Sequence, residues 1–290
     1  MATLENARHG TTRSAPQLRY WTGGRGATPV LLIMGFGMRG RVWRPQIQDL
    51  GKDHQLAWYD HRGVGESERG RAKRWRMEDM AADALRVMDS VGWGSAHVVG
   101  VSMGGMIAQH VALRAEARVR SLTLIATHAG GPFAGMPTPK GARQFLSSFT
   151  AKEPGQKVQA LRELLYPPAF LAEVDPASLG ERMRDQMGQP APRPVLLAQL
   201  EAVWRHRTGA RLEGLEVPAL IVKPTQDLLV RPENSDELKR RLAHARFLEL
   251  EDAGHGAIFQ SAKPINAAIR RLVSDVEATR LVQSQPTIQA

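Results

Sequence analysis

Three side chains in the sequence have the types of a serine nucleophile, its base and an orienting acid, and each follows an apolar run of strand length. Ser102 is the middle residue of the Gly-x-Ser-x-Gly pattern at Gly100 to Gly104, and Asp227 and His255 follow later in the chain. A serine hydroxyl is a weak nucleophile near neutral pH and needs a base, which in turn needs an orienting acid. The types and their order predict Ser102 as nucleophile, His255 as base and Asp227 as acid.

The Gly-x-Ser-x-Gly pattern gains its meaning from its surroundings, because short motifs also occur by chance. The serine lies between the apolar run 97–101 and the helical segment 103–113, where a sharp strand-to-helix turn would lift its hydroxyl out of a sheet. The glycines at 100, 104 and 105 allow the backbone to pack without room for a Cβ. The start of the following helix would favour negative charge that develops near Ser102.

A second glycine-rich turn, Met34 to Met38, follows the strongest apolar run of the first fifty residues. Acyl transfer needs hydrogen-bond donors at the oxygen of the tetrahedral intermediate. We assign this oxyanion hole to the backbone N–H groups of Phe36 and Met103. The proposed chemistry requires no metal ion and no cofactor.

Each of the three residues has a simpler explanation when it is taken alone. A serine in a glycine-rich turn is usually a turn residue, an aspartate after a strand often caps a helix, and most loop histidines are solvated. Their coincidence at three strand ends, in the order Ser, Asp, His, favours the catalytic explanation. Asp252 is a rival for the acid role, but it lies too near His255 in sequence to sit naturally on a separate loop.

The elements that must position these residues read as an α/β fold. Apolar runs alternate with segments of helical period, which is typical of βαβ units and a mostly parallel sheet. We expect strands at 28–34, 54–59, 97–101, 119–126, 217–222 and 245–250, and helices at 42–50, 77–91, 103–113, 232–242 and 264–273. Because the carboxyl ends of parallel strands meet at one edge, the three residues should converge there.

The alternation stops between about residues 130 and 208, where prolines separate four short helical candidates. This pattern predicts an inserted helical cap. The expected organisation is a core made of 16–130 and 209–280, a cap at 131–208, and flexible ends at 1–15 and 281–290. Most apolar cap residues should pack the cap onto the core, and some should line a pocket. We expect the substrate to contact Gly35, Phe36, Met103, Phe145, Met187, Trp204 and Phe259.

The composition excludes several classes of protein. The 290 residues contain no cysteine, which excludes a disulfide framework, a cysteine nucleophile and thiolate-held metal sites. With 42% hydrophobic and 23% charged residues the chain reads as soluble and globular. It lacks an apolar run long enough for a membrane span and a recognisable secretory signal, so we expect a cytoplasmic protein.

The formal net charge of +10 raises the question of an anionic partner. The cations are spread in ones and twos, and the densest run, at 69–76, is short and lies in a loop. Solvated faces explain this pattern, so we expect no nucleic-acid partner; arginines of the cap could also attract an acidic group. The expected partner is a small hydrophobic ester, and the sequence leaves open whether the chain forms a homodimer.

The ordered motifs together resemble those of the α/β-hydrolase superfamily over nearly the whole chain. They are Gly35–Gly37, Asp60–Ser67, Gly100–Gly105, Asp227 and Gly254–His255. The resemblance implies an eight-stranded, mostly parallel sheet with helices on both faces and an inserted cap. It implies the same triad, a structural role for Asp60–Ser67, and carboxylic ester hydrolysis through an acyl-enzyme.

Two departures from the superfamily pattern are visible. Many relatives have His-Gly before the oxyanion loop, whereas Met34 precedes Gly35 here, a form similar to the aclacinomycin methylesterase-like branch. The acid loop usually reads Gly-x-x-Asp, but Pro224 replaces that glycine. The first departure removes a side-chain hydrogen bond that steadies the loop, and the second stiffens the turn. Neither removes a catalytic group.

Several other reactions remain open on the same triad. Lactone hydrolysis, carbon–carbon bond hydrolysis of a diketone, acyl transfer and cofactor-free perhydrolysis all use it, and the serine motif does not separate them. Epoxide hydrolases and haloalkane dehalogenases carry aspartate at the nucleophile position and are disfavoured by Ser102. A non-catalytic ligand-binding protein of this fold often lacks a triad member or an oxyanion glycine, and this sequence has both.

Overall fold

The computed structural model describes residues 6–132, 134–187 and 191–284, and it is built around one eight-stranded sheet. The strand order is β1-β2-β4-β3-β5-β6-β7-β8. Strand β2 is antiparallel to both of its neighbours, β1 and β4. The six strands β4, β3, β5, β6, β7 and β8, in their order across the sheet, run parallel to one another. The strands are β1 (Arg8–Thr11), β2 (Arg19–Gly23), β3 (Pro29–Ile33), β4 (Gln55–Tyr59), β5 (Ala96–Val101), β6 (Val119–Ile125), β7 (Ala219–Pro224) and β8 (Arg246–Leu250).

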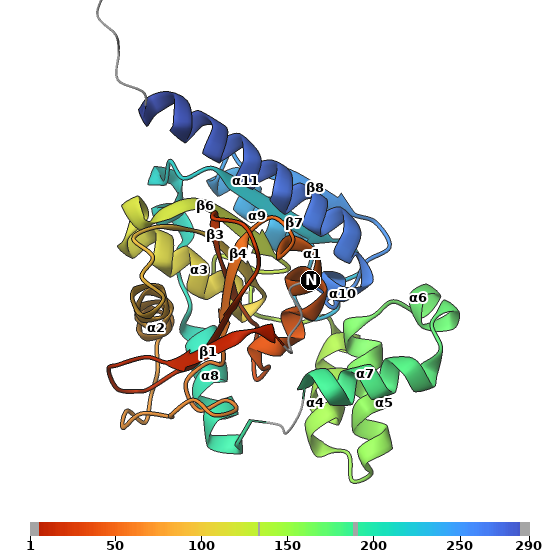
Figure 1. Cartoon of the computed structure of the whole chain (residues 1–290). Coiled ribbons are helices and arrows are strands. Elements are labelled where there is room, and N and C mark those ends of the chain that lie inside the picture. Colours follow the sequence, from red (N-terminus) through yellow and green to blue (C-terminus); the bar gives the residue numbers. More distant parts are fainter. Residues whose placement is uncertain (1–5, 133, 188–190, 285–290) are drawn as a thin grey trace, which may run out of the picture.

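Helices cover both faces of this sheet (Figure 1). One core lies under α2 (Met77–Ser90), α3 (Met103–Arg114) and α9 (Glu233–Arg241), and the other under α1 (Arg44–Leu50) and α11 (Ala262–Ser284). The central strands β3 and β5 are buried along their whole length, which explains why their sequences are continuous apolar runs rather than alternating ones. The α/β-hydrolase architecture expected from the sequence is therefore confirmed.

Parts of the two segments predicted to be flexible belong to described secondary structure. Part of the segment predicted to be flexible, Arg8–Thr11, is β1, which pairs with β2 by backbone hydrogen bonds while most of its side chains are exposed. Such an edge strand needs no apolar alternation, so the periodicity analysis missed it. The last helix, α11, continues to Ser284 and so includes the first residues of the expected tail.

In the described part of the chain, five α-helices, rather than four, lie between β6 and β7. They are α4 (Pro139–Thr150), α5 (Pro154–Leu165), α6 (Pro168–Glu173), α7 (Pro176–Met187) and α8 (Arg193–Arg205). Each has a proline at its first or second position, where the missing N–H costs no hydrogen bond. Helices α4 to α7 form a group beside the sheet, seen in green in Figure 1, whereas α8 packs on the core through Val195 and Ala198 against Val64 and Trp75.

The two ends of this insertion are fastened to each other. Gly130 and Arg207 form an antiparallel bridge, and the N–H of Thr208 donates to the carbonyl of Ala129 at 2.9 Å. Short 3-10 helices, η2 (Gly40–Trp43), η3 (Glu116–Arg118) and η4 (Gly209–Gly214), and the four-residue α10 (Ala257–Gln260) complete the described elements. None of the helices in the described ranges is long and apolar enough to cross a membrane.

Candidate active site

Ser102 occupies the turn between β5 and α3 in a backbone conformation that favours glycine. Its φ of 55° and ψ of −124° lie outside the ordinary regions, and such a residue costs about 1–3 kcal/mol unless its surroundings hold it. Those surroundings are present. The N–H of Ser102 donates to the carbonyl of Ile125 at 2.9 Å, and the Thr127 hydroxyl donates to the carbonyl of Ser102 at 2.8 Å. The half-buried Ser102 is thus held at the carboxyl edge of the sheet.

The glycines around Ser102 are required by close packing. A Cβ on Gly104 would overlap the carbonyl oxygen of Ile33, and one on Gly100 would overlap that of Gly104. Helix α3 can therefore begin directly against β3 and β5. This is the physical reason for the Gly-x-Ser-x-Gly spacing that the sequence analysis singled out.

Asp227 and His255 lie together after β7 and β8. The ring Nδ1 of His255 is 2.6 Å from Oδ2 of Asp227, and both side chains are buried, with exposed fractions of 8% and 2%. The other oxygen, Oδ1, accepts the N–H groups of Leu229 and Val230 at 2.8 and 2.9 Å. Because a carboxylate can only accept, Nδ1 carries the proton and Nε2 is left as the basic atom. The rival Asp252 is exposed.

The acid loop and the histidine loop are joined to each other and to the insertion. The N–H of Gln226 donates to the carbonyl of Ala253 at 2.9 Å, and the N–H of Gly256 donates to the carbonyl of Leu165, at the end of α5, at 2.8 Å. A Cβ on Gly256 would overlap the ring of Tyr166. The loop that carries His255 is therefore packed directly against the inserted helices.

The loop expected to form the oxyanion hole lies against Ser102. A Cβ built on Gly35 would be 3.3 Å from Cβ and 3.8 Å from Oγ of Ser102. Gly37 has a φ of +66°, so the turn after Phe36 needs a glycine. The backbone N–H groups of Phe36 and Met103 take part in no hydrogen bond with the rest of the described chain. Both are therefore free to donate to a ligand, and Met103, as the first residue of α3, has no acceptor within its helix.

Two side chains steady this loop, and the sequence analysis assigned neither to the site. Nε2 of His61 donates to the carbonyl of Met34 at 2.7 Å, and complete burial lowers the pKa of His61 and keeps its ring neutral. From α8, Oε1 of Gln199 accepts the N–H of Gly37 at 2.8 Å. His61 belongs to a motif that had been recognised as structural. Nothing in the local sequence distinguishes Gln199 from any other helical glutamine.

The Asp60–Ser67 motif supports the site from behind. Oδ1 of Asp60 accepts the N–H of Gly40 at 2.7 Å, and the Ser67 hydroxyl donates to the carbonyl of Asp60 at the same distance. Burial raises the pKa of Asp60 to about 6. Arg62 forms a bidentate pair with Asp83 of α2 at 2.6 and 2.8 Å. The motif thus ties the loop after β4 to the neighbouring elements.

Aromatic side chains form two sets, one at the loop that contains Phe36 and one after the loop that contains His255. Phe36 packs against Phe145 of α4 with ring centroids 6.0 Å apart, and Phe149 extends this set at 4.9 Å from Phe145. After the histidine loop, Phe259 packs against Tyr166 and Phe170 at 6.1 and 6.2 Å. Each set joins a residue of the core, Phe36 or Phe259, to rings of the insertion.

Trp204, one of the residues expected to contact substrate, is not buried against the core. Trp204 is 62% exposed on the side of α8 opposite the buried Ala198 and Ala202, so its assignment is not supported. The helical spacing that buries Gln199 turns Trp204 outward, which the composition of the segment alone could not reveal. Met187 ends α7, and its side chain lies outside the described part of the structure.

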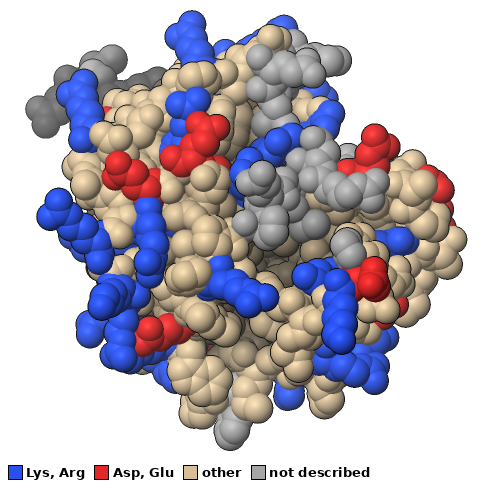
Figure 2. Space-filling model, turned by 90° about the horizontal axis from the view of Figure 1, so that it is seen from below, with Lys and Arg blue, Asp and Glu red and all other residues tan. Residues whose placement is uncertain are grey.

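Among the charged side chains on the surface seen from below Figure 1, basic ones predominate (Figure 2). Lys and Arg side chains are scattered over both the core half and the insertion half, acidic groups are fewer, and the surface is hollowed near its middle (Figure 2). The basic groups form no single dense patch in this view. This agrees with the even spread of cations along the sequence.

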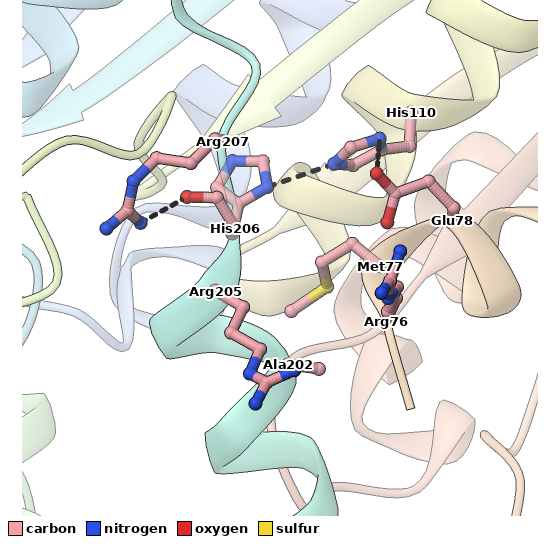
Figure 3. A pocket seen from close by; sticks show the side chains of 8 residues that line it. All are labelled: Arg76, Met77, Glu78, His110, Ala202, Arg205, His206 and Arg207. Carbon is pink, nitrogen blue, oxygen red and sulfur yellow. Dashed lines mark hydrogen bonds and ion pairs between the residues drawn. The ribbon is translucent and has the colours of Figure 1, made fainter. Parts of the chain in front are cut away.

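A separate cavity of about 190 Å³ lies where the insertion rejoins the core (Figure 3). Its lining contains no triad residue and consists of Arg76, Met77, Glu78, His110, Ala202, Arg205, His206 and Arg207.

The histidines of this cavity form a hydrogen-bonded chain. Nε2 of His206 donates to the carbonyl of His128 at 3.0 Å, so Nδ1 of His206 accepts from Nε2 of His110 at 3.2 Å. Burial lowers the pKa of both histidines. Glu78 lies 3.6 Å from Nδ1 of His110. Among the described residues, no group of three His, Asp or Glu side chains could hold a metal ion.

The chain is similar in sequence and in fold to several known proteins. The protein named "Putative carbamate hydrolase RutD" from Azorhizobium caulinodans is 34% identical over 228 residues, which cover 79% of this chain and 84% of that protein. The protein of the same name from Caulobacter vibrioides is 32% identical over 247 residues, 84% of this chain and 89% of its own. The enol-lactonase from Burkholderia xenovorans superimposes with a TM-score of 0.77 at 23% identity, covering 92% of this chain and all of that structure.

The sequence model described as alpha/beta hydrolase fold matches residues 28–262, a range that contains Ser102, Asp227 and His255. The strand order, the turn that carries Ser102 and the sequence similarity all indicate the same fold family. The chain belongs to the alpha/beta hydrolase fold family and is a hydrolase.

Proposed function

We propose that the chain is a serine hydrolase that cleaves a carboxylic ester of a hydrophobic small molecule through an acyl-enzyme. The observation that carries this proposal is the 2.6 Å hydrogen bond between His255 and Asp227, formed at the same sheet edge as the strained Ser102. It leaves Nε2 of His255 as a base. No other described acid pairs with this ring, which makes Asp227 its orienting group.

The reaction follows from these groups. Oγ of Ser102 attacks the ester carbonyl and gives its proton to Nε2 of His255, while the carbonyl oxygen becomes an oxyanion held by the N–H groups of Phe36 and Met103. The C–O bond then breaks, and the alcohol leaves with the proton from His255. Water attacks the acyl-enzyme in the same way and releases the acid and Ser102. Each oxyanion donor is worth about 3 kcal/mol in such a site.

The aromatic sets at Phe36 and Phe259 support a hydrophobic substrate. They flank the site on the oxyanion-loop side and on the histidine-loop side, and each includes rings from the insertion. Rings of this kind favour an acyl chain or a hydrophobic ring over a small charged molecule.

Carbamate hydrolysis is the second candidate, and the likeness to proteins named for it favours its inclusion. A carbamate carbonyl can be attacked by the same serine and released by the same histidine. Lactone hydrolysis, diketone carbon–carbon bond hydrolysis, acyl transfer and perhydrolysis also fit this triad. Substrate trials must separate these reactions.

The test is hydrolysis of a chromogenic ester series, from acetate to long-chain acyl, by the wild type and Ser102→Ala in parallel, with phenyl carbamates and simple lactones beside them. We expect ester turnover with a chain-length optimum, abolished in the variant. Faster turnover of carbamates than of every ester would replace the first candidate by the second. Near-wild-type activity of Ser102→Ala would remove the serine mechanism altogether, whereas labelling of Ser102 by a phosphonate without ester turnover would direct the search to lactones and diketones.

A further inference from the structure

Gln199 is a fully buried polar residue in the middle of α8, with an exposed fraction of 0%. Its Oε1 accepts the N–H of Gly37 at 2.8 Å. Its Nε2 is buried and has no hydrogen-bond partner in the described part of the chain. The contact with Gly37 also fixes the orientation of the amide, because only the oxygen can accept from an N–H group.

Packing does not explain a glutamine at this position. The neighbours on the buried face of α8 are Val195, Ala198 and Ala202, so the surroundings are apolar. A buried N–H group without a partner costs about 1–3 kcal/mol. A leucine or methionine would fill the same space without that cost. We therefore look for a role of Gln199 that offsets the free-energy cost of its buried, unpaired amide N–H.

The hydrogen bond from Gly37 to Gln199 indicates this role. Gly37 directly follows Phe36, whose N–H is one of the two assigned oxyanion donors, and the turn between them is closed by a long bond from Met38 to Gly35 of 3.4 Å. A turn with one weak internal hydrogen bond needs an external support to hold its N–H groups in place. Leu196, beside Gln199, packs directly on Gly37.

Helix α8 can provide that support because it is fixed to the core. Val195 and Ala198 pack against Val64 and the fully buried Trp75, and Val195 also lies against Gly63. A rigid helix on one side and Ser102 on the other thus enclose the oxyanion loop.

We propose that Gln199 is a positioning residue, which holds the oxyanion loop through Gly37 so that the N–H of Phe36 meets the oxygen that becomes negative. This inference rests on the proposed serine mechanism. Gln199 touches none of the reacting atoms in this account. Its removal should affect the transition state more than the binding of the ester, because the oxyanion contact strengthens as the charge develops.

The test compares Gln199→Leu, Gln199→Glu and the control Leu197→Gln, which changes an exposed side chain of the same helix. In Gln199→Leu we expect kcat to fall about 10- to 100-fold, with KM changed less than about threefold, since one oxyanion donor is misplaced rather than removed. The midpoint of thermal unfolding should stay within about 3 °C of the wild type, because the lost hydrogen bond is offset by removal of the unpaired amide. The control should keep wild-type kinetics.

Gln199→Glu adds a readout that a merely structural role would not give. The acid keeps an oxygen for the N–H of Gly37, but its ionised form places a negative charge near the developing oxyanion, and burial raises the pKa of a carboxyl. The ratio of kcat for this variant to kcat for the wild type should therefore rise as the pH is lowered from 8 to 6. Taking the ratio cancels the pH dependence that both proteins share.

Wild-type kcat in Gln199→Leu would overturn the proposal, as would a glutamate variant that is as slow as the leucine variant at every pH. If Gln199→Leu does not fold, Gln199→Met, which has a similar volume and only a weakly accepting thioether in place of the amide oxygen, takes its place in the comparison. Ser102→Ala is measured in the same series. Retained activity there would show that the serine mechanism itself has failed, whereas an inactive Ser102→Ala beside a fully active Gln199→Leu would refute this inference alone.

Discussion

Asp227 uses both carboxylate oxygens, one for His255 and one for the backbone N–H groups of Leu229 and Val230. In Asp227→Asn the amide can keep the backbone contacts with its oxygen, but it then presents N–H groups to Nδ1 of His255. The ring would turn to the wrong tautomer, and the imidazolium would lose its counter-charge. We expect kcat to fall about 10⁴-fold with little change in folding, as measured by ester hydrolysis and circular dichroism.

The matched control for this prediction is Asp252→Asn, which changes an exposed carboxylate three residues from the same histidine. It should keep wild-type kcat. A loss of only a few-fold in Asp227→Asn together with a large loss in the control would move the acid role to Asp252 and contradict the hydrogen-bond geometry.

At the scale of elements, α4 meets the oxyanion loop through rings. Phe145 lies 6.0 Å from Phe36 and 4.9 Å from Phe149, so Phe145→Ala opens a space beside the loop. We expect kcat/KM to fall about 10-fold for the preferred ester, because apolar contact is lost, and to fall less for esters with longer acyl chains that refill the space. The measurement is the chain-length profile. Leu146→Ala, at an exposed position of the same helix, is the control, and an unchanged profile in Phe145→Ala would place the acyl group elsewhere.

The sequence was sufficient for the central elements because burial dictates their composition. Strands β3 to β8 and helices α2 and α3 lie near the expected ranges. Strands β3 to β7 are mostly buried on both faces and α2 buries one face, which favours apolar residues at those positions. Strand β8, at the edge of the sheet, is only partly buried. The strand β1 escaped prediction because backbone pairing at an edge leaves its side chains exposed. Helix α11 was underestimated because its last turns are exposed and show little apolar period.

In the candidate site, too, residues that follow the parallel strands were easier to predict than residues on the inserted helix α8. Ser102, Asp227 and His255 could be proposed from the sequence because topology brings parallel strand ends together whatever the side chains. Gln199 and Trp204 could not be placed, because their roles depend on which way α8 is turned against the core. That rotation is set by tertiary contacts with Val64 and Trp75. Sequence reasoning therefore locates chemistry on strands better than on inserted helices.

At the scale of the whole molecule, the folded state shields histidines from water. Burial lowers the pKa of His54, His61, His97, His110, His128 and His206, and the pKa values of His97 and His128 fall to about 4. In the unfolded chain these rings titrate near 6.5. Asp60 acts in the opposite direction, because burial raises its pKa to about 6. Between pH 6.5 and 4 the unfolded chain therefore binds more protons through the histidines than the folded chain binds through Asp60.

Stability rises with pH wherever the unfolded state binds more protons, so acidification below pH 6.5 should destabilise the protein. We expect the midpoint of thermal unfolding to be level from pH 8 to 7 and to fall steadily from pH 6.5 to 4.5. His128→Asn removes one of these groups while its side-chain oxygen can still accept the N–H of Gly130, which Nδ1 of His128 accepts at 3.0 Å. The variant should show a shallower decline than the wild type in the same buffers. A midpoint that rises on acidification would mean that Asp60 outweighs the buried histidines, and equal slopes in the two proteins would mean that His128 takes up its proton in the folded state as readily as in the unfolded chain.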